Sequence, residues 1–359
     1  MPFLTRLFGV TFSDADRNLA REPGDIEEIT KKSLLMQANA AAQQHRALAR
    51  GTHAKGVCAL AQFEVLDVAE GRDPALAARL AQGIFAKPGI YPATVRFGNA
   101  DSKKNSDFKP DVRSLSFSVD LTRGGTVVPD AGYGRQDFSM QNTTTLPIND
   151  SPAFLAIIKL LTASNPVAGL WSLSFKDKLR VFRTLALVQV QSHQTIRPYQ
   201  QMRFGSNVPF RHGPAEVVKY SATPSPNNLA RPLQKSNPNG LLDELIRHVQ
   251  EDNKMSNFDF GVQLLDPEKM SYRGKQYDSS FWIENASVEW KESEASFHTV
   301  ARLTLLKGSN LSPEETKAVY FDVTHHSSSD TTPVGSINRA RALAEAASRT
   351  ARMAAAQQV

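Results

Sequence analysis

A chain of 359 residues with 41% hydrophobic and 22% charged residues can bury a substantial core, and its 20 glycines and 20 prolines are scattered, which excludes a disordered or fibrous protein. The net charge of +6 does not indicate nucleic-acid binding, because no stretch interleaves basic with aromatic residues. Cys58 is the single cysteine, so one chain can build neither a disulfide nor a thiolate metal cluster.

The N-terminal stretch of residues 1–12 does not resemble a secretory signal. It lacks an apolar core and a small-residue cleavage site, and Ser13, Asp14 and Asp16 follow it directly. The chain has no run of about 18 apolar residues, so no membrane span is predicted. Together with the single cysteine, these features predict a cytoplasmic protein.

Helix-forming residues dominate residues 23–50, where Ala, Gln, Glu, Lys and Leu occur without an internal proline. This composition predicts a helical arm that Gly51 ends. We therefore assign residues 1–50 to an N-terminal arm and residues 51–359 to a second, larger unit. Arms of this kind can exchange between subunits, so a homo-oligomer is included among the expected partners.

Short apolar segments with partial alternation follow the arm and predict strands. They are residues 58–68, 93–99, 112–121, 203–220, 258–265, 282–290 and 300–306. Helical periods are found at residues 74–85, 151–190, 241–251 and 336–357. Two strand sets with helices between them predict an α+β fold, namely a closed antiparallel β-barrel with surrounding helices.

A histidine between two glycines opens the first predicted strand, in the segment RGTHAKG at residues 50–56. With Phe63-Glu64-Val65 further on, this segment resembles the Arg-x-x-His-Ala-x-Gly and Phe-x-Val motifs of the haem-dependent catalases. The resemblance implies that His53 stands over the haem and moves a proton between the two oxygens of a bound peroxide. Imidazole suits this role because its ordinary pKa is about 6.5. An isolated histidine would more simply cap the strand.

Two arginines extend the resemblance. Val95-Arg96-Phe97, followed by residues 111–113, is similar to the catalase pattern Val-Arg-Phe-Ser and Asp-x-Arg-Gly-x-Ala. In that family the arginines at the positions of Arg50 and Arg96 contact the haem propionates, and a guanidinium fork pairs well with a carboxylate. Taken alone, either arginine would be an ordinary surface residue.

The segment 137–143 (DFSMQNT) resembles the catalase segment that carries the distal asparagine. The resemblance implies that the Asn142 amide hydrogen-bonds the peroxide and polarises its O–O bond. Catalases continue with Asn-Thr-Pro-x-Phe-Phe, but this chain has Leu146 and Pro147, so both phenylalanines are lost. We expect the haem to be packed differently on this side.

Later segments follow the catalase order without carrying chemistry. They are residues 208–213, 217–220, 258–264 and 287–290. The resemblance thus extends over residues 50–352 and implies the catalase core, a barrel with the haem between it and the C-terminal helix. We expect these later segments to form barrel core.

The final helix departs from the family at its central residue. The segment 333–348 resembles Gly-x-x-Asn-Arg-x-Arg-x-x-x-Tyr-x-x-Ser, in which the tyrosinate binds the iron and an arginine keeps it ionised. Arg341 and Ser348 are in place, but Glu345 replaces the tyrosine. Three interpretations stay open: Glu345 binds iron as a carboxylate; water or another side chain does, with His325 or His326 as distant candidates; or no haem binds and Arg341 and Glu345 form a simple salt pair.

Two further positions bear on the substrate. Gly98 replaces the catalase serine whose hydroxyl orients the distal histidine, and Thr52 stands where true catalases usually have valine. Thr52 resembles the catalase-related allene oxide synthases and small haem peroxidases, which implies organic hydroperoxides rather than hydrogen peroxide.

We therefore expect a haem-dependent hydroperoxide oxidoreductase with haem b. The catalytic residues would be His53, Asn142 and Thr52, and the iron ligand would be Glu345. Arg50, Arg96 and Arg341 would hold or tune the cofactor. The alternative is a haem-free protein of catalase fold that acts as a binding or structural module. A lipocalin-like barrel is a third interpretation, although such barrels are usually much shorter.

Overall fold

The computed structural model describes residues 21–356 except 46, 49, 124–133 and 326. Residues 1–12, which we interpreted above, and the candidate ligand His326 lie outside the described residues. None of the described helices is long and apolar enough to cross a membrane.

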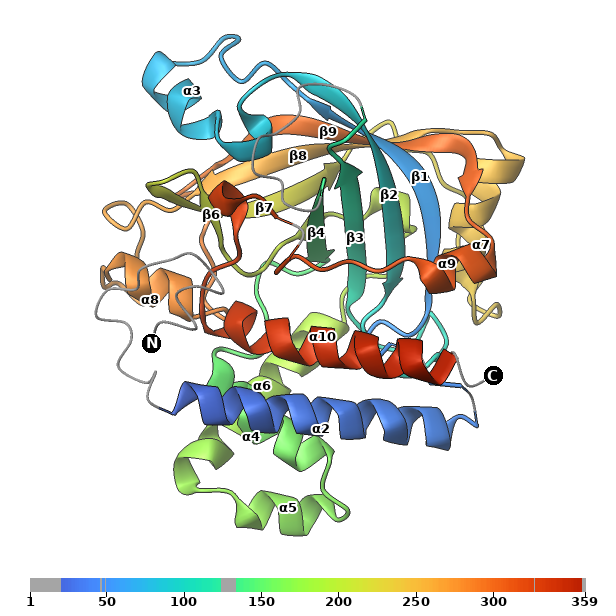
Figure 1. Ribbon diagram of the computed structural model, residues 1–359, viewed down its shortest axis with the longest axis vertical. Coiled ribbons are helices and arrows are strands. Elements are labelled where there is room, and N and C mark those ends of the chain that lie inside the picture. The colour runs from blue at the N-terminus through green and yellow to red at the C-terminus, as the bar shows by residue number, and fades with distance from the viewer. Residues whose placement is uncertain (1–20, 46, 49, 124–133, 326, 357–359) are drawn as a thin grey trace.

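Antiparallel strands form a closed barrel (Figure 1). They are β1 (Gly56–Val65), β2 (Gly89–Asn99), β3 (Arg113–Asp120), β4 (Arg135–Gln141), β5 (Phe204–Gly205), β6 (Phe210–His212), β7 (Glu216–Pro224), β8 (Ser256–Leu264) and β9 (Phe297–Asn310). The order around the ring is β5-β4-β3-β2-β1-β9-β8-β7, and the pairing of β5 with β7 closes it. β6 pairs with β7 beside the ring. The predicted α+β class and closed antiparallel barrel are confirmed.

Aromatic side chains fill the barrel interior. Phe63, Phe117, Phe138 and Phe260 are fully buried and in mutual ring contact, and the rings of Phe117 and Phe138 lie 4.7 Å apart between centroids. Alternate residues of each strand point inward, so these rings interdigitate at the centre. The interior is therefore packed core, and a site for a large ligand must lie at the rim or outside.

Helices surround the barrel, and several of them stack beneath one rim. The described α-helices are α2 (Glu22–Gln43), α3 (Pro74–Leu80), α4 (Ser151–Leu161), α5 (Pro166–Ser172), α6 (Phe175–Ser192), α7 (Gly240–Ile246), α8 (Ser279–Glu284), α9 (Pro313–Ala318) and α10 (Ser336–Ala356). Short 3₁₀ turns occupy Gly83–Phe85, Tyr199–Gln201 and Ser329–Thr331, and a π-helical turn occupies Arg247–Glu251. Figure 1 shows α10 along the rim, α2 below it, and α5 at the far end of the molecule.

A small apolar cluster joins α2, α4 and α10. Its buried members are Ile26, Ile29, Leu155, Ile158, Ala340 and Ala344. The two alanines of α10 let the neighbouring helices approach closely, because they present only a methyl group. The first and last described helices are thus packed together, although they stand at opposite ends of the sequence.

A buried ion network reinforces this packing. The Arg339 guanidinium donates to Glu22 at 2.8 Å and to Glu284 at 2.8 Å, and all three side chains are largely buried. The two carboxylates raise the pKa of Arg339. Ser151 and Ser336 complete the network by donating to Glu22 Oε1, each at 3.0 Å.

The predicted strand over residues 282–290 is wrong. The Asp278 carboxylate accepts the Phe281 N–H at 3.0 Å and caps α8, so the segment begins as a helix and continues as turns. The apolar residues Trp282, Val288 and Trp290 pack in a satellite cluster outside the barrel core, which explains the misleading pattern.

Other boundaries also differ from the predictions. The first helix ends at Gln43 rather than at Arg50, because His45 adopts a left-handed backbone with φ of +47°. The helical stretch 151–190 is three helices rather than one. The sequence pattern does not predict β4, since its buried residues Gln136 and Asp137 are polar. The division of the chain at residue 50 stays a prediction.

Candidate functional site

The chain segment before β1 meets the helix α10. A side chain added at Gly51 would place its Cβ 3.1 Å from Ser348 Oγ, so only glycine allows this approach without a shift. Gln37 Nε2 of α2 also donates to the Ser348 carbonyl at 3.3 Å. The RGTHAKG segment thus lies beside α10, and α2 contacts the same residue of that helix.

His53 lies at this junction and is partly exposed. Its backbone has a left-handed φ of +57°, and its N–H donates to the Ala100 carbonyl at 3.0 Å. Its Nδ1 lies 3.1 Å from Thr52 Oγ1. Burial, followed by the charges of Arg96, Arg50 and Arg341, lowers the pKa of His53 to about 3. The imidazole is therefore neutral at neutral pH.

Arg96 is held in a space that two glycines provide. Gly56 and Gly98 face each other across β1 and β2, and a Cβ on Gly56 would lie 2.5 Å from the Arg96 guanidinium. The buried Arg96 donates from Nη2 to the His53 carbonyl at 2.8 Å. Its Nε has no hydrogen-bond partner among the described residues. The arginine thus supports the backbone of His53 and retains an unused donor.

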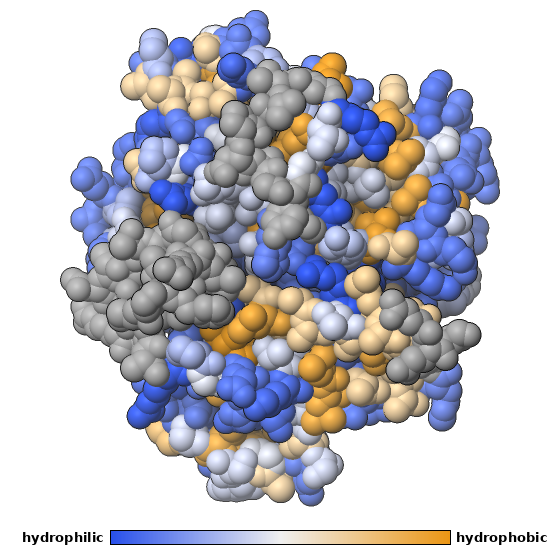
Figure 2. Space-filling view, viewed as in Figure 1, coloured by the Kyte–Doolittle hydropathy of each residue, from blue (hydrophilic) through white to orange (hydrophobic). Residues whose placement is uncertain are grey.

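Further arginines gather beside Arg96. Arg50 donates to the Val319 carbonyl, and its pKa falls to about 8 through burial and through the charges of Arg96 and Arg352. Arg352 also lowers the pKa of Arg96, after burial and other effects. Within the described part of the chain, no carboxylate forms an ion pair with Arg50, Arg96 or Arg352. Strongly hydrophilic residues are visible between the barrel and α10 in Figure 2.

This arginine cluster fits an anionic ligand. Like charges that are desolvated together destabilise one another, and they are relieved by a carboxylate or phosphate that accepts their N–H groups. The unused Nε of Arg96 is a donor of this kind. The donor set therefore fits a group with carboxylates, such as haem with its two propionates.

Arg352 was not identified from the sequence. It stands seven residues after Glu345 and four after Ser348, so it lies on the same side of α10 as both. That helical spacing is the signal that could have found it.

Glu345 is engaged by Arg341. Arg341 Nε donates to Glu345 Oε1 at 2.9 Å, and the Glu345 side chain is 42% exposed. Among the described residues, no group of three or more His, Cys, Asp or Glu side chains could hold a metal ion. The alternative ligand His325 is exposed in a turn whose N–H groups donate to Asp322, which pairs with Arg349 of α10 at 2.6 Å.

Asn142 follows β4 on the same rim of the barrel. The register aligns Gly56, Gly98, Ser114 and Gln141 across four strands, so residue 142 lies just beyond this row, as His53 does. Asn142 Oδ1 accepts the Arg113 N–H at 2.7 Å. Its Nδ2 is therefore the amide atom that can donate to a ligand.

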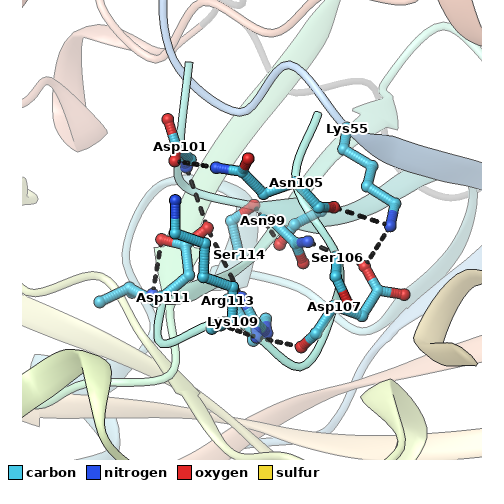
Figure 3. Close-up of polar contacts among 12 residues, drawn as sticks. Lys55, Asn99, Asp101, Asn105, Ser106, Asp107, Lys109, Asp111, Arg113 and Ser114 are labelled. Atoms are coloured by element: carbon cyan, nitrogen blue, oxygen red, sulfur yellow. Dashed lines mark hydrogen bonds and ion pairs between the residues drawn. The ribbon is translucent and has the colours of Figure 1, made fainter. Parts of the chain in front are cut away.

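A buried polar network supports the rim (Figure 3). Lys55 Nζ lies 2.7 Å from Asp107 Oδ1, and Asn99 donates to the same oxygen at 2.9 Å. Arg113 donates to the Asp107 carbonyl at 2.5 Å. This network fixes the loop 101–111, whose Asp101 carbonyl accepts the Ala54 N–H at 3.1 Å. The sequence gives no spacing signal for the ion pair of Lys55 and Asp107, because 52 residues separate the partners.

Comparisons with known proteins identify the fold. No protein-family model matches the chain, and no curated protein does. The solved structures that resemble it include a fungal catalase (TM-score 0.58, 13% identity, 82% of this chain), catalase A from Saccharomyces cerevisiae (0.58, 15%, 82%) and a bacterial catalase (0.56, 16%, 90%). The match covers only 57–59% of the length of those catalases. The chain has the catalase fold, and at this identity the likeness shows the fold alone.

Proposed function

We propose that this protein is a haem-dependent oxidoreductase that acts on hydroperoxides. The observation that carries the proposal is the group of arginines without carboxylate partners that lies beside a neutral His53. A catalase fold without a cofactor would have no evident need for this uncompensated charge. When bound, haem would supply the iron redox chemistry that cleaves the O–O bond.

The cofactor would be held mainly by arginines. Arg50, Arg96 and Arg352 would donate hydrogen bonds to the two propionate carboxylates. The charge of Arg352 adds to burial in lowering the pKa values of Arg50 and Arg96, and the Nε of Arg96 is unused. Glu345 would offer the iron a hard anionic oxygen, and Arg341 would hold that carboxylate in place through the contact at 2.9 Å.

Proton movement would belong to His53. Thr52 Oγ1 contacts Nδ1, so Nε2 is free to take the hydroperoxide proton and to return it to the departing oxygen. Burial is the main cause of the low pKa of His53, and carboxylates bound to the arginines would offset the additional lowering by Arg96, Arg50 and Arg341 and so raise that pKa. The imidazole would thus become a better base when the site is loaded.

Two other side chains would position the substrate. Asn142 Nδ2 would donate to a hydroperoxide oxygen without titrating, because Oδ1 is occupied by Arg113. Thr52 would orient the imidazole from the side opposite to the reacting nitrogen, in place of the serine hydroxyl that is absent at Gly98. The substrate would be an organic hydroperoxide, because Thr52 stands where the catalase-related enzymes differ from true catalases.

A second candidate function is that of a haem-free binding module. The exposed Glu345, already paired with Arg341, favours it, because a surface pair of this kind is stable without a metal. In this case the arginine cluster would hold another carboxylate or phosphate ligand.

Hemin titration of the purified chain separates the two candidates. The haem proposal predicts a Soret band that saturates at one haem per chain. Arg50→Gln and Arg352→Gln should each weaken hemin binding about tenfold or more, because each loses a charge-assisted hydrogen bond. Arg123→Gln, at an exposed surface position, is the matched control. A featureless spectrum without saturable binding would leave the binding-module candidate.

The iron ligand is tested separately. Glu345→Ala should alter the spectrum of bound haem while retaining most of the affinity that the arginines provide. Glu345→Tyr should raise hemin affinity and give a phenolate-type spectrum. Identical spectra in wild type and Glu345→Ala would show that Glu345 does not bind the iron.

A further inference from the structure

The helices α5 and α6 expose an unusual number of apolar side chains. Of the 16 large hydrophobic residues that are exposed in the described part of the chain, nine lie between residues 161 and 190. Trp171 and Phe175 are 74% and 77% exposed. No residue of α5 is buried. Scattered apolar residues are normal on protein surfaces, but a concentration of this kind marks an interaction site.

These side chains form one face, which we call the α5–α6 face. Phe175, Leu179 and Phe182 follow each other at helical spacing, so they share one side of α6, while Val181 and Thr184 are buried on another side. Trp171 extends this face onto α5. Lys178 Nζ lies 4.9 Å from the centroid of the Trp171 ring and joins the two helices.

The α5–α6 face is also basic. Lys176, Lys178, Arg180 and Arg183 lie on α6 together with a single acidic residue, Asp177. Asp177 is paired with Arg180 at 2.7 Å, and no carboxylate in the described part of the chain forms an ion pair with Lys176, Lys178 or Arg183. Aromatic and aliphatic residues thus alternate with uncompensated positive charge.

We propose that the α5–α6 face docks the protein on an anionic lipid surface. An interfacial helix combines Trp, Phe and Leu with Lys and Arg, so that the apolar side chains enter the headgroup region and the cations meet anionic lipids. A second copy of this chain fits less well, because a symmetric contact through the α5–α6 face would bring like charges together. Figure 1 shows α5 at the end of the molecule farthest from the barrel, where a flat surface can reach it.

Vesicle binding of the full chain tests this proposal directly. We expect co-sedimentation with vesicles of phosphatidylcholine and phosphatidylglycerol, little with phosphatidylcholine alone, and a decrease as salt rises. Trp171→Ser combined with Phe175→Ser should weaken binding at least tenfold. Leu60→Ser combined with Ile90→Ser, at exposed apolar positions of the barrel, is the matched control. Lys176→Glu with Arg183→Glu should remove the preference for anionic lipid.

Tryptophan fluorescence gives an independent measurement. The chain has three tryptophans, and Trp282 and Trp290 are only 1% and 3% exposed, so a change on binding reports Trp171. Anionic vesicles should shift the emission to the blue and protect it from acrylamide. All of these substitutions are at exposed positions, so thermal melts should stay unchanged and exclude misfolding.

Two results would overturn the proposal. One is the absence of both co-sedimentation and a spectral shift with anionic vesicles. The other is a self-association, measured by sedimentation equilibrium, that the Trp171 and Phe175 substitutions abolish while lipid binding is unaffected. That second result would assign the α5–α6 face to a second copy of the chain. Neither depends on whether the protein binds haem.

Discussion

At the scale of single residues, glycine decides how the candidate site is built. The sequence suggests that Gly98 leaves His53 without the hydroxyl that orients it in catalases. The structure shows instead that Thr52 contacts the imidazole, and that Gly98 makes room for the backbone of Lys55 and for Arg96. The loss of the serine is thus linked to the placement of the arginine.

Restoring the serine should therefore be harmful. A Cβ on Gly98 would lie 2.6 Å from the Lys55 carbonyl oxygen, which is backbone and cannot move aside. Gly98→Ser should lower the free energy of unfolding in urea by about 1–3 kcal/mol, as other overpacked sites do. The control Gly24→Ser, where a Cβ meets nothing within 4 Å, should change it by less than about 0.5 kcal/mol. Equal stability of the two variants would contradict this account.

His53 should make the protein sensitive to acid. Its folded pKa of about 3 lies below its ordinary value, so between pH 6.5 and 3 the unfolded chain binds a proton that the folded chain does not. This contribution to stability is complete above pH 6.5 and is lost as the pH falls toward 3. His53→Gln should therefore show a smaller drop in Tm between pH 6.5 and 4.5, whereas the exposed control His193→Gln should follow the wild type. An unchanged drop in His53→Gln would refute the assignment.

At the scale of elements, most strands and helices can be predicted from local pattern. The exceptions have physical causes. Trp282 and Trp290 alternate like a strand because they pack in a cluster against the outside of the barrel, and β4 is hidden because Gln136 and Asp137 are buried by polar contacts that only the folded chain provides. The pattern of apolar residues thus shows which residues are buried, but it does not show which part of the fold covers them.

Residues 282–290, which pack against the outside of the barrel, also bury the side chain of Lys219. Lys219 of β7 lies 4.8 Å from the Trp290 ring, and burial lowers its pKa to about 7. Between pH 7 and 10 the unfolded chain therefore binds a proton that the folded chain lacks, so stability rises with pH in this window. Lys219→Met should stabilise the protein at pH 7 and flatten that rise, measured as the free energy of unfolding in urea. The exposed Lys307→Met is the control, and a steeper rise in Lys219→Met would be evidence against the burial argument.

At the scale of the whole molecule, the sequence predicts which segments form the candidate site. It does not predict how the charges of these segments are paired or buried. Arg50, Arg96 and His53 are recognised by motif, and the fold brings them together. The ion pair of Lys55 with Asp107 escapes sequence reasoning, because its two residues come from distant segments. Arg352 is marked in the sequence only by its helical spacing from Glu345 and Ser348. The site depends on the tertiary packing of α10 against the barrel.

The Arg339 network holds α10 in that position. Arg339→Leu would leave Glu22 and Glu284 buried without their cation, which typically costs about 3–5 kcal/mol. Lys317→Leu, which breaks an exposed pair with Glu314, should cost less than about 1 kcal/mol. Urea unfolding followed by circular dichroism measures both. A loss below about 1 kcal/mol in Arg339→Leu would show that the network does not anchor the helix.

The pairing of α2 with α10, the first and last described helices, has a consequence for synthesis. The contact between Gln37 and Ser348 spans 311 residues, and that between Glu22 and Arg339 spans 317. A growing chain can close its barrel while the final helix is still inside the ribosome, since β9 ends at Asn310. The site beside His53 is completed only when α10 has emerged, so any ligand of the arginine cluster joins a chain whose barrel strands have already been made.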